Sequence, residues 1–327
     1  MQIVKFKIKL LFLFILTLSL YSKDLYDVYR YNGCESVKKI LENSIQSPAF
    51  WLNRLKNIDV SFGYFEYKKN ILFCNKLQRT LSVYYVDKGK FKHIKTFNVI
   101  VGKLGDKEKE GDLVTPIGVY KLNAVLNNID SFYGPFAFET SYPNLYDELL
   151  GRDGHGIWIH GKPLDGEKRP DLSKGCIVLD NPDLIYLKKL INYQNTYLLI
   201  NDSNPLKATK QEIADILAFL YKWRNAWEHN NFEKYKNFYD KGFKRYNGDN
   251  LIKFLDYKKR VFYNKKYQKV EIYFKKINII PYQNTENEKI FRIDMYEDYI
   301  SKSYKYHGPK ELFIKKTPEG YKIIIEK

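Results

Sequence analysis

The sequence predicts a multidomain α+β protein, and three observations lead to this class. A short helical pattern precedes a long stretch of β-rich segments and turn residues between about residues 70 and 200. A polar linker follows at 201–206, and beyond it helical periodicity gives way to alternating runs that suit an antiparallel sheet. At 327 residues the chain is long enough for two such domains, each with its own core.

Residues 1–22 are predicted to be a secretory signal rather than part of either domain. Lys5, Lys7 and Lys9 precede an apolar run from Leu10 to Leu20, which is too short to span a bilayer. We expect cleavage near Ser22, with an uncleaved signal anchor as the alternative. Both interpretations place the mature chain outside the cytoplasm, and the first leaves it without a stable membrane span.

Residues 23–69 are predicted to form a helical N-terminal region. Apolar residues between Val37 and Leu55 recur at helical spacing, with a restart at Ser47-Pro48. Fewer than fifty residues make a poor independent core. This region is therefore expected to pack on the next domain, on a partner copy, or on both.

Residues 70–202 are predicted to form a mostly β domain. Two β-rich runs, at 81–86 and ending at 101, flank the turn 87–89 and indicate a hairpin. A polar Gly-rich loop follows, and Thr115 to Leu122 then starts another strand. After Cys176, Asn181 is expected to cap a helix whose apolar residues are buried.

Residues 207–327 are predicted to form a cone of helices and an antiparallel sheet. Thr209 and Glu212 match a capping box that opens a long amphipathic helix, and a second helical piece is expected to carry Tyr235, Phe238 and Tyr239. Four alternating runs beyond residue 265 predict the strands. The aromatic stripe on the helices is expected to be core, with a ligand pocket as the alternative.

Charge and cysteine content narrow the function. The net charge of +17 is spread along an exported chain, so we expect no nucleic-acid partner, although a basic surface favours an anionic polymer such as the cell wall. Three cysteines are an odd number for an oxidising compartment. Cys34 and Cys74 either pair or are both buried thiols, which leaves Cys176 as the expected free thiol.

Cys176 has four possible roles: half of a disulfide, a metal ligand, a buried small residue, or a nucleophile. A metal site would draw on His155 and His160, but residues five apart on one strand point to opposite faces. No zinc-ligand spacing occurs elsewhere, so we expect no metal and no cofactor.

The nucleophile hypothesis fits the surroundings of Cys176 better. Gly175 lets the backbone approach a substrate, and its amide, with that of Cys176, could bind an oxyanion. His160 on a separate strand could take the thiol proton, Trp158 on the same face could form the pocket floor, and Lys174 favours a thiolate. The alternatives are a core histidine, a core tryptophan and a solvated surface lysine.

Two motifs resemble a known family. H-G at 160–161 with S-K-G-C-I at 173–177, and G-D-L-V-T-P-I-G-V-Y-K-L at 111–122, are similar to the signatures of L,D-transpeptidase catalytic domains of the YkuD type, over about residues 70–202. The resemblance implies action on peptidoglycan stem peptides, with Cys176 as nucleophile, His160 as base and the Gly161 carbonyl orienting the imidazole. It also implies that Ser173, Gly175 and the Cys176 amide shape an oxyanion site.

Two positions depart from that pattern. Lys174 stands where many members have His or Arg, and Val178 stands where many have Arg. A substrate-anchoring charge is therefore absent or is supplied elsewhere, by Arg169 or Lys162.

The C-terminal part resembles an NTF2-like domain, and the whole arrangement is similar to cell-shape-determining L,D-carboxypeptidases of helical and curved bacteria. That resemblance implies a periplasmic homodimer, joined through the N-terminal region, that removes D-Ala from stem tetrapeptides. A transpeptidase making 3-3 crosslinks would share every catalytic residue. A non-catalytic wall-binding scaffold is the alternative from another class.

Overall fold

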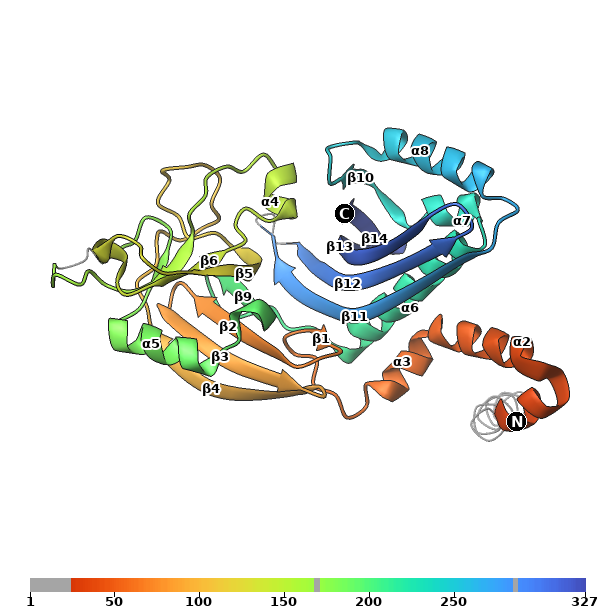
Figure 1. The fold of residues 1–327 in the computed structure, drawn as a ribbon, viewed down its shortest axis with the longest axis horizontal. Coiled ribbons are helices and arrows are strands. Elements are labelled where there is room, and N and C mark those ends of the chain that lie inside the picture. Colours follow the sequence, from red (N-terminus) through yellow and green to blue (C-terminus); the bar gives the residue numbers. More distant parts are fainter. Residues whose placement is uncertain (1–24, 168–170, 285–287) are drawn as a thin grey trace, which may run out of the picture.

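Two β-sheets organise the computed structural model, which describes residues 25–167, 171–284 and 288–327 (Figure 1). One sheet lies in the middle of the chain and the other in its C-terminal part, with helices around both. The predicted multidomain α+β class is therefore confirmed. The predicted signal sequence, residues 1–22, and Arg169 lie outside the described residues.

The elements follow the chain in a simple order: helices first, then the first sheet with its short helices, then long helices and the second sheet. The helices and 3-10 turns are α2 (Leu25–Ile45), α3 (Pro48–Arg54), η1 (Ser131–Tyr133), α4 (Leu145–Leu149), α5 (Asn181–Leu190), η2 (Tyr193–Asn195), α6 (Lys210–Glu228), α7 (Phe232–Lys236) and α8 (Leu251–Asn264). The strands are β1 (Tyr64–Phe65), β2 (Lys69–Asn75), β3 (Thr80–Asp87), β4 (Lys90–Asn98), β5 (Gly118–Leu126), β6 (Ala137–Thr140), β7 (Trp158–His160), β8 (Ile177–Val178), β9 (Thr196–Asn201), β10 (Tyr239–Arg245), β11 (Val270–Gln283), β12 (Lys289–Ser301), β13 (Lys305–Thr317) and β14 (Gly320–Glu326).

The first sheet has eight strands in the order β4-β3-β2-β9-β5-β6-β7-β8. The predicted hairpin is confirmed as β3 and β4, and its two strands are antiparallel. β2 runs parallel to β9, and β7 runs parallel to β8, whereas the other neighbours are antiparallel. The parallel pair β7–β8 forms one edge of the sheet.

Two sequence expectations around this edge need correction. β7 begins only at Trp158, so His155 lies before the strand, and the alternation expected from His155 to His160 does not apply. Asp180 and not Asn181 occupies the N-cap position of helix α5, and its side chain makes no capping hydrogen bond. The Asn181 side chain instead accepts a hydrogen bond from the Lys162 amide at 2.9 Å, which joins the start of α5 to the segment that follows β7.

The second sheet has six strands in the order β1-β11-β12-β13-β14-β10, and its long strands curve beside α6 and α8 (Figure 1). The predicted capping box at the start of α6 is confirmed, because Thr209 and Glu212 cap each other's backbone amides. Tyr239 begins β10 rather than continuing a helix. Trp223 and Tyr235 are fully buried, so most of the aromatic stripe is core.

The N-terminal region is helical only as far as α3. Trp51 and Leu55 are buried in the hydrophobic cluster of the C-terminal domain. The Asp59 amide donates to the Gly89 carbonyl, between β3 and β4, at 2.8 Å. This region therefore packs on both sheets. Helical structure was also predicted for Tyr64 and Phe65, but these residues form β1 on the edge of the second sheet. An alternating, aromatic edge strand completes that sheet better than another turn of helix would. No residue of α2 is buried.

The two sheets share part of one hydrophobic core. Val119 and Tyr197 from the first sheet belong to the same buried cluster as Phe313 from the second. Two polar contacts join the same surfaces: Arg292 Nη1 donates to the Val119 carbonyl at 2.7 Å, and Tyr197 Oη donates to Asp294 Oδ2 at 2.7 Å. The first sheet and the second therefore form a continuous packed unit.

Cys34 and Cys74 do not pair with each other. Cys34 is exposed on α2 and Cys74 is fully buried in β2, where desolvation raises the pKa of its thiol to about 12. Neither expectation for this pair is met as stated, since they form no disulfide and only one is buried. Among the described helices, none is long and apolar enough to cross a membrane.

Candidate active site

The edge pair β7–β8 brings Cys176 next to Trp158. In the parallel ladder Ile159 is opposite Ile177, and His160 is opposite Val178, so Cys176 enters β8 beside the start of β7. The Trp158 amide donates to Cys176 Sγ at 3.4 Å, and the thiol donates to the carbonyl of Gly156, also at 3.4 Å. The thiol is half-buried, which leaves part of it open to solvent.

His160 is fully buried next to this thiol-bearing strand. Its Nδ1 lies 2.7 Å from the carbonyl oxygen of Gly161. The ring of Tyr133 packs edge-on against His160 and Trp158, with ring centroids 5.1 Å apart in each case. Tyr133 was not predicted as a site residue, and its position after Asp130 in a 3-10 turn gives no sequence signal for this role.

Gly161 is held from two directions. Its amide donates to the Tyr133 carbonyl at 2.9 Å. A Cβ atom on Gly161 would lie 2.1 Å from Asn181 Oδ1, so no other residue type fits without moving Asn181. Asn181 is the second site residue that the sequence did not reveal, because its place at a helix start suggested a cap.

The turn before the thiol requires glycine at position 175. Gly175 has φ +116°, and a Cβ there would come within 2.9 Å of the Val114 carbonyl oxygen. The Gly175 amide donates to Ser173 Oγ at 3.1 Å, and that hydroxyl donates to the Cys176 carbonyl at 2.6 Å. Ser173 therefore fixes the turn, and the Gly175 amide is already engaged within it.

The upstream motif 111–122 lies against the same turn. Thr115 is fully buried, and its hydroxyl accepts the Gly102 amide at 2.8 Å. A Cβ on Gly102 would lie 3.1 Å from the Gly175 amide nitrogen and 2.3 Å from the Leu113 carbonyl oxygen. Two segments that look independent in the sequence thus meet at one glycine turn.

The remaining candidate residues surround the site at different depths. Lys174 is exposed, and Trp158 is half-buried with an indole N–H that has no hydrogen-bond partner among the described residues. Val178 is 1% exposed and its amide pairs with Ile100, so this position offers no charge to a substrate. Lys162 Nζ pairs with Asp180.

A cavity of about 890 Å³ lies in the C-terminal domain, and Trp227 lines part of it. Lys310 contacts Glu326 and lies 3.5 Å from Glu297. Although burial alone would raise it, the positive charges of Lys310 and Lys258 hold the pKa of Glu326 at about 2. Lys258 Nζ lies 4.3 Å from the centroid of the Trp227 ring and makes no hydrogen bond within the described residues. Burial lowers the pKa of Lys258 to about 8.

Across the part of the chain that the structure describes, no group of three or more His, Cys, Asp or Glu side chains is placed to hold a metal ion. His155 is exposed and His160 is buried, and they do not share a strand.

Two family models match the chain. Residues 69–204 match the L,D-transpeptidase catalytic domain of the YkuD family, and residues 215–327 match the Cds6 C-terminal NTF2-like domain. Among curated proteins, the "Putative L,D-transpeptidase YafK" of Escherichia coli K12 is 31% identical over 108 residues. That match spans 32% of this chain and 40% of the relative's length.

Solved structures are similar over most of the chain. The helical cell shape determining protein Pgp2 from Campylobacter jejuni is 38% identical, with a TM-score of 0.82. The alignment covers 87% of this chain and 99% of that one. Bd1075 from Bdellovibrio bacteriovorus is 29% identical, with a TM-score of 0.65, and the alignment covers 82% and 97% of the two chains.

Proposed function

Because this chain belongs to the L,D-transpeptidase family, in the form that carries an NTF2-like domain, we propose that it is a peptidoglycan L,D-carboxypeptidase. The substrate is a stem tetrapeptide, and the bond cleaved joins meso-diaminopimelate to the terminal D-Ala. The product is a stem tripeptide. The similarity to a helical cell shape determining protein along almost its full length supports a role in cell shape.

One observation carries the catalytic part of the proposal: a half-buried thiol lies beside the strand of a histidine whose tautomer is fixed. A carbonyl oxygen can only accept a hydrogen bond, so His160 Nδ1 carries the proton and the lone pair of the neutral imidazole is at Nε2. Such a histidine can act as a general base toward Cys176. The Tyr133 ring excludes water from one side of the imidazole, and Trp158 packs against Tyr133.

In the first half of the reaction Cys176 Sγ attacks the carbonyl carbon of the meso-diaminopimelate residue. His160 Nε2 accepts the thiol proton and then passes it to the departing nitrogen, so D-Ala leaves as an amine while a thioester forms. The Cys176 amide is the proposed oxyanion donor. Ser173 and Gly175 contribute by fixing the turn, because the Gly175 amide is bonded to Ser173 Oγ.

In the second half water resolves the thioester. His160 Nε2 takes a proton from the water, hydroxide adds to the thioester carbonyl, and the sulfur leaves and recovers that proton. The tripeptide then dissociates with a new carboxylate. An amine in place of water would give a 3-3 crosslink, which is the transpeptidase outcome.

Muropeptide mass analysis tests this function. Purified mature chain is incubated with tetrapeptide muropeptides, and we expect free D-Ala and tripeptides that Cys176→Ala no longer produces. Crosslinked dimers in place of tripeptides would assign a transpeptidase. Unchanged tetrapeptides, or unchanged activity in Cys176→Ala, would contradict both enzymes and support a wall-binding scaffold.

The assembly and the compartment are also part of the proposal. Tyr26, Tyr31 and Leu41 of α2 are exposed, while the C-terminal end of α2 lies next to α3 and pairs with α6 through Glu42 and Arg224 (Figure 1). We propose that α2 forms a homodimer contact and that the protein acts in the periplasm. Light scattering on the full chain and on Leu41→Asp should give a dimer and a monomer, and a monomeric parent would contradict the first part.

A further inference from the structure

A buried group of three charged residues supports the region around the thiol. This group, the Arg152 cluster, consists of Asp106, Asp147 and Arg152. Arg152 Nη1 lies 2.6 Å from Asp106 Oδ2 and 2.9 Å from Asp147 Oδ1. The Arg152 side chain is only 8% exposed, and the two carboxylates are less exposed still. Removing one member of such a group leaves a buried charge uncompensated, so the group holds its chain segments firmly together.

The first segment that the cluster holds is the loop 102–117. Asp106 Oδ1 accepts the amides of Lys107 and Ile117, at 2.9 and 2.7 Å. Within the same loop, the Val114 carbonyl oxygen lies against Gly175, where a Cβ would come within 2.9 Å of it. A displacement of Asp106 therefore reaches the turn that carries the thiol.

The second segment begins at Arg152 itself and runs into β7. Asp153 Oδ1 accepts the Glu110 amide at 2.6 Å, which ties this segment to the loop 102–117. Farther along, the carbonyl of Gly156 accepts a hydrogen bond from the Cys176 thiol at 3.4 Å. Both segments that contact the thiol or its turn are thus attached to one guanidinium.

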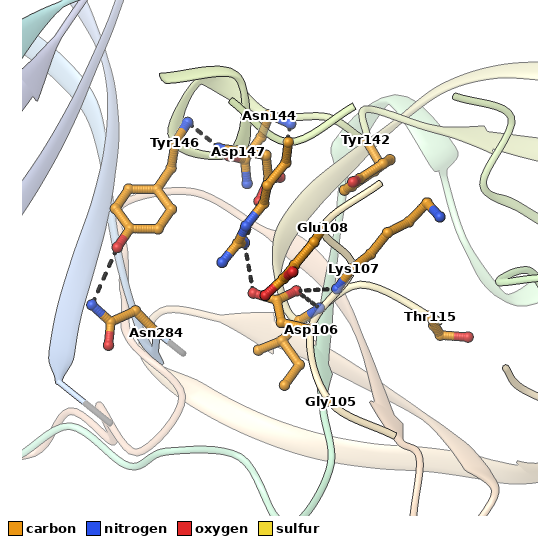
Figure 2. A network of polar contacts seen from close by, with 12 residues as sticks. Gly105, Asp106, Lys107, Glu108, Thr115, Tyr142, Asn144, Tyr146, Asp147 and Asn284 are labelled. Atoms are coloured by element: carbon orange, nitrogen blue, oxygen red, sulfur yellow. Dashed lines mark hydrogen bonds and ion pairs between the residues drawn. The ribbon is translucent and has the colours of Figure 1, made fainter. Parts of the chain in front are cut away.

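The third segment is α4, which lies against the C-terminal domain. Asp147 belongs to α4, and next to it Tyr146 Oη accepts a hydrogen bond from Asn284 Nδ2 at 3.2 Å. The Tyr146 ring centroid is 5.5 Å from that of Phe313, and Lys244 Nζ donates to the carbonyl of the last residue of α4 at 2.9 Å. Figure 2 shows Tyr146 directed toward Asn284, with the neighbouring Asp147 on the side that faces Asp106 of the loop 102–117.

We infer that Arg152 is a positioning residue for the chemistry at Cys176, and that the C-terminal domain holds it in place through α4. This inference rests on the proposed function in taking Cys176 as the nucleophile. A single guanidinium nitrogen, Nη1, contacts both carboxylates at once, and the lysine side chain, which is one bond shorter, does not bring its ammonium to that position. Without that contact, Val114 and Gly156 can shift relative to the thiol, and a displacement of about 1 Å can cost about a hundredfold in rate.

The test uses Arg152→Lys in the full chain carrying Cys34→Ser. Since Cys74 is fully buried, Cys176 is the thiol that iodoacetamide reaches in this background. Two quantities are measured: kcat and KM for tetrapeptide cleavage, and the alkylation rate of Cys176 between about pH 5 and 9. We expect kcat to fall about tenfold with KM unchanged, and the midpoint of the alkylation profile to move.

Arg224→Lys is the matched control. Arg224 is as deeply buried as Arg152, but its charged partners are Glu42 and Glu228, on α2 and α6. It should lose stability while keeping the parent kcat and alkylation profile. An equal loss of kcat in both variants, or none in Arg152→Lys, would overturn the inference.

A milder variant covers the case in which Arg152→Lys does not fold. Asp153→Ala removes only an exposed carboxylate and its bond to the Glu110 amide. We expect kcat to fall about two- to fivefold, and an unchanged kcat would overturn the inference. If the parent itself cleaves no tetrapeptide, the proposed function fails, while the alkylation profiles still decide the positioning role.

A double-mutant cycle tests the contribution of the C-terminal domain. Tyr146→Phe removes the hydroxyl that contacts Asn284, so it should lower kcat less than Arg152→Lys does. In the Arg152→Lys background, Tyr146→Phe should cause no further loss of kcat, because Arg152 no longer holds the segments around the thiol in place. Fully additive losses would show that α4 acts independently of Arg152.

Discussion

The imidazole Nδ1 of His160 lies 2.7 Å from the carbonyl oxygen of Gly161, the next residue in the chain. The backbone that supplies this acceptor is itself fixed, because the Gly161 amide donates to Tyr133 and its Cα faces Asn181. The orientation of the histidine therefore depends on packing around one glycine, rather than on a carboxylate as in a Ser-His-Asp triad.

Gly161→Ala should consequently lower kcat more than the addition of a single methyl group suggests. The added Cβ would lie 2.1 Å from Asn181 Oδ1, so either the Asn181 side chain or the Gly161 backbone, whose carbonyl orients His160, must move. We expect kcat for tetrapeptide cleavage to fall at least about tenfold. Gly242→Ala is the control, since a Cβ there meets only Asp240 Oδ1 at 3.3 Å, and it should keep the parent kcat.

Ser173→Ala should destabilise the thiol-bearing turn. The hydroxyl accepts the Gly175 amide and donates to the Cys176 carbonyl, and its loss leaves two buried backbone groups without this partner. Urea unfolding should show a decrease of about 1–3 kcal/mol in the free energy of unfolding. The exposed Ser82 bonds Thr96 at the surface, so Ser82→Ala should change stability far less; equal effects would contradict the buried role.

Lys258→Met should stabilise the protein at neutral pH. Burial lowers the pKa of Lys258 to about 8, below the 10.5 of the unfolded chain. The protonated ammonium is therefore less favourable in the folded protein than in the unfolded chain, and it destabilises the fold at neutral pH. At about 1.4 kcal/mol for each pKa unit, less the lost contact with Trp227, the gain should be about 1–3 kcal/mol. This gain in stability should be complete below pH 8 and should disappear above pH 10.5, where the lysine is neutral in both states.

Lys310→Met provides the opposite control for this cavity. Lys310 is equally buried, but its contacts with Glu297 and Glu326 raise its pKa above the ordinary value, so its removal should destabilise the protein. Thermal unfolding of both variants at pH 7 measures the difference. A loss of stability in both variants would contradict the claim that the buried Lys258 ammonium destabilises the protein.

Asp147→Asn should flatten the dependence of stability on pH. Burial is the main cause that raises the pKa of Asp147 to about 6, against 3.8 in the unfolded chain. The stability that its protonation contributes is fully present below the unfolded value and is lost as the pH rises through about 6. Urea unfolding of the parent at a series of pH values should show a loss of about 2–3 kcal/mol over that window.

The exposed Asp256 on α8 gives a control for that pH series. Asp256→Asn should follow the parent profile, because its side chain is solvated. A profile in Asp147→Asn that falls as steeply as that of the parent would assign the pH dependence to another group.

The sequence predicted elements that depend on local chemistry. The hairpin β3–β4 follows from a turn between two β-rich runs, and the start of α6 follows from the Thr209–Glu212 capping box. It did not reveal β1, β10 or α8. In β1 two residues gain strand geometry only because β11 lies alongside them, and in α8 several aromatic residues hid the helical pattern.

The site residues also divide into those that a local motif predicts and those that only the folded structure brings together. Cys176, His160 and Gly161 were proposed from short motifs, whose residues lie close in the sequence. Tyr133 and Asn181 reach the site from other segments and carry no motif. Arg152 was missed because a lone arginine among polar loop residues predicts solvent exposure, whereas it is buried between the nearby Asp147 and the distant Asp106.

The pairing of β1 with β11 has a consequence for how the chain acquires its structure. The Ile277 amide donates to the Glu66 carboxylate across a sequence separation of 211 residues, and Tyr64 pairs with Ile279. Contacts so remote form late and slow the folding rate. A nascent chain that has not yet released β11 keeps the surface of Val119 and Tyr197 uncovered, and such surfaces recruit chaperones or proteases. Synthesis of the last third of the protein is thus the step that covers this surface of the first sheet and protects it from aggregation.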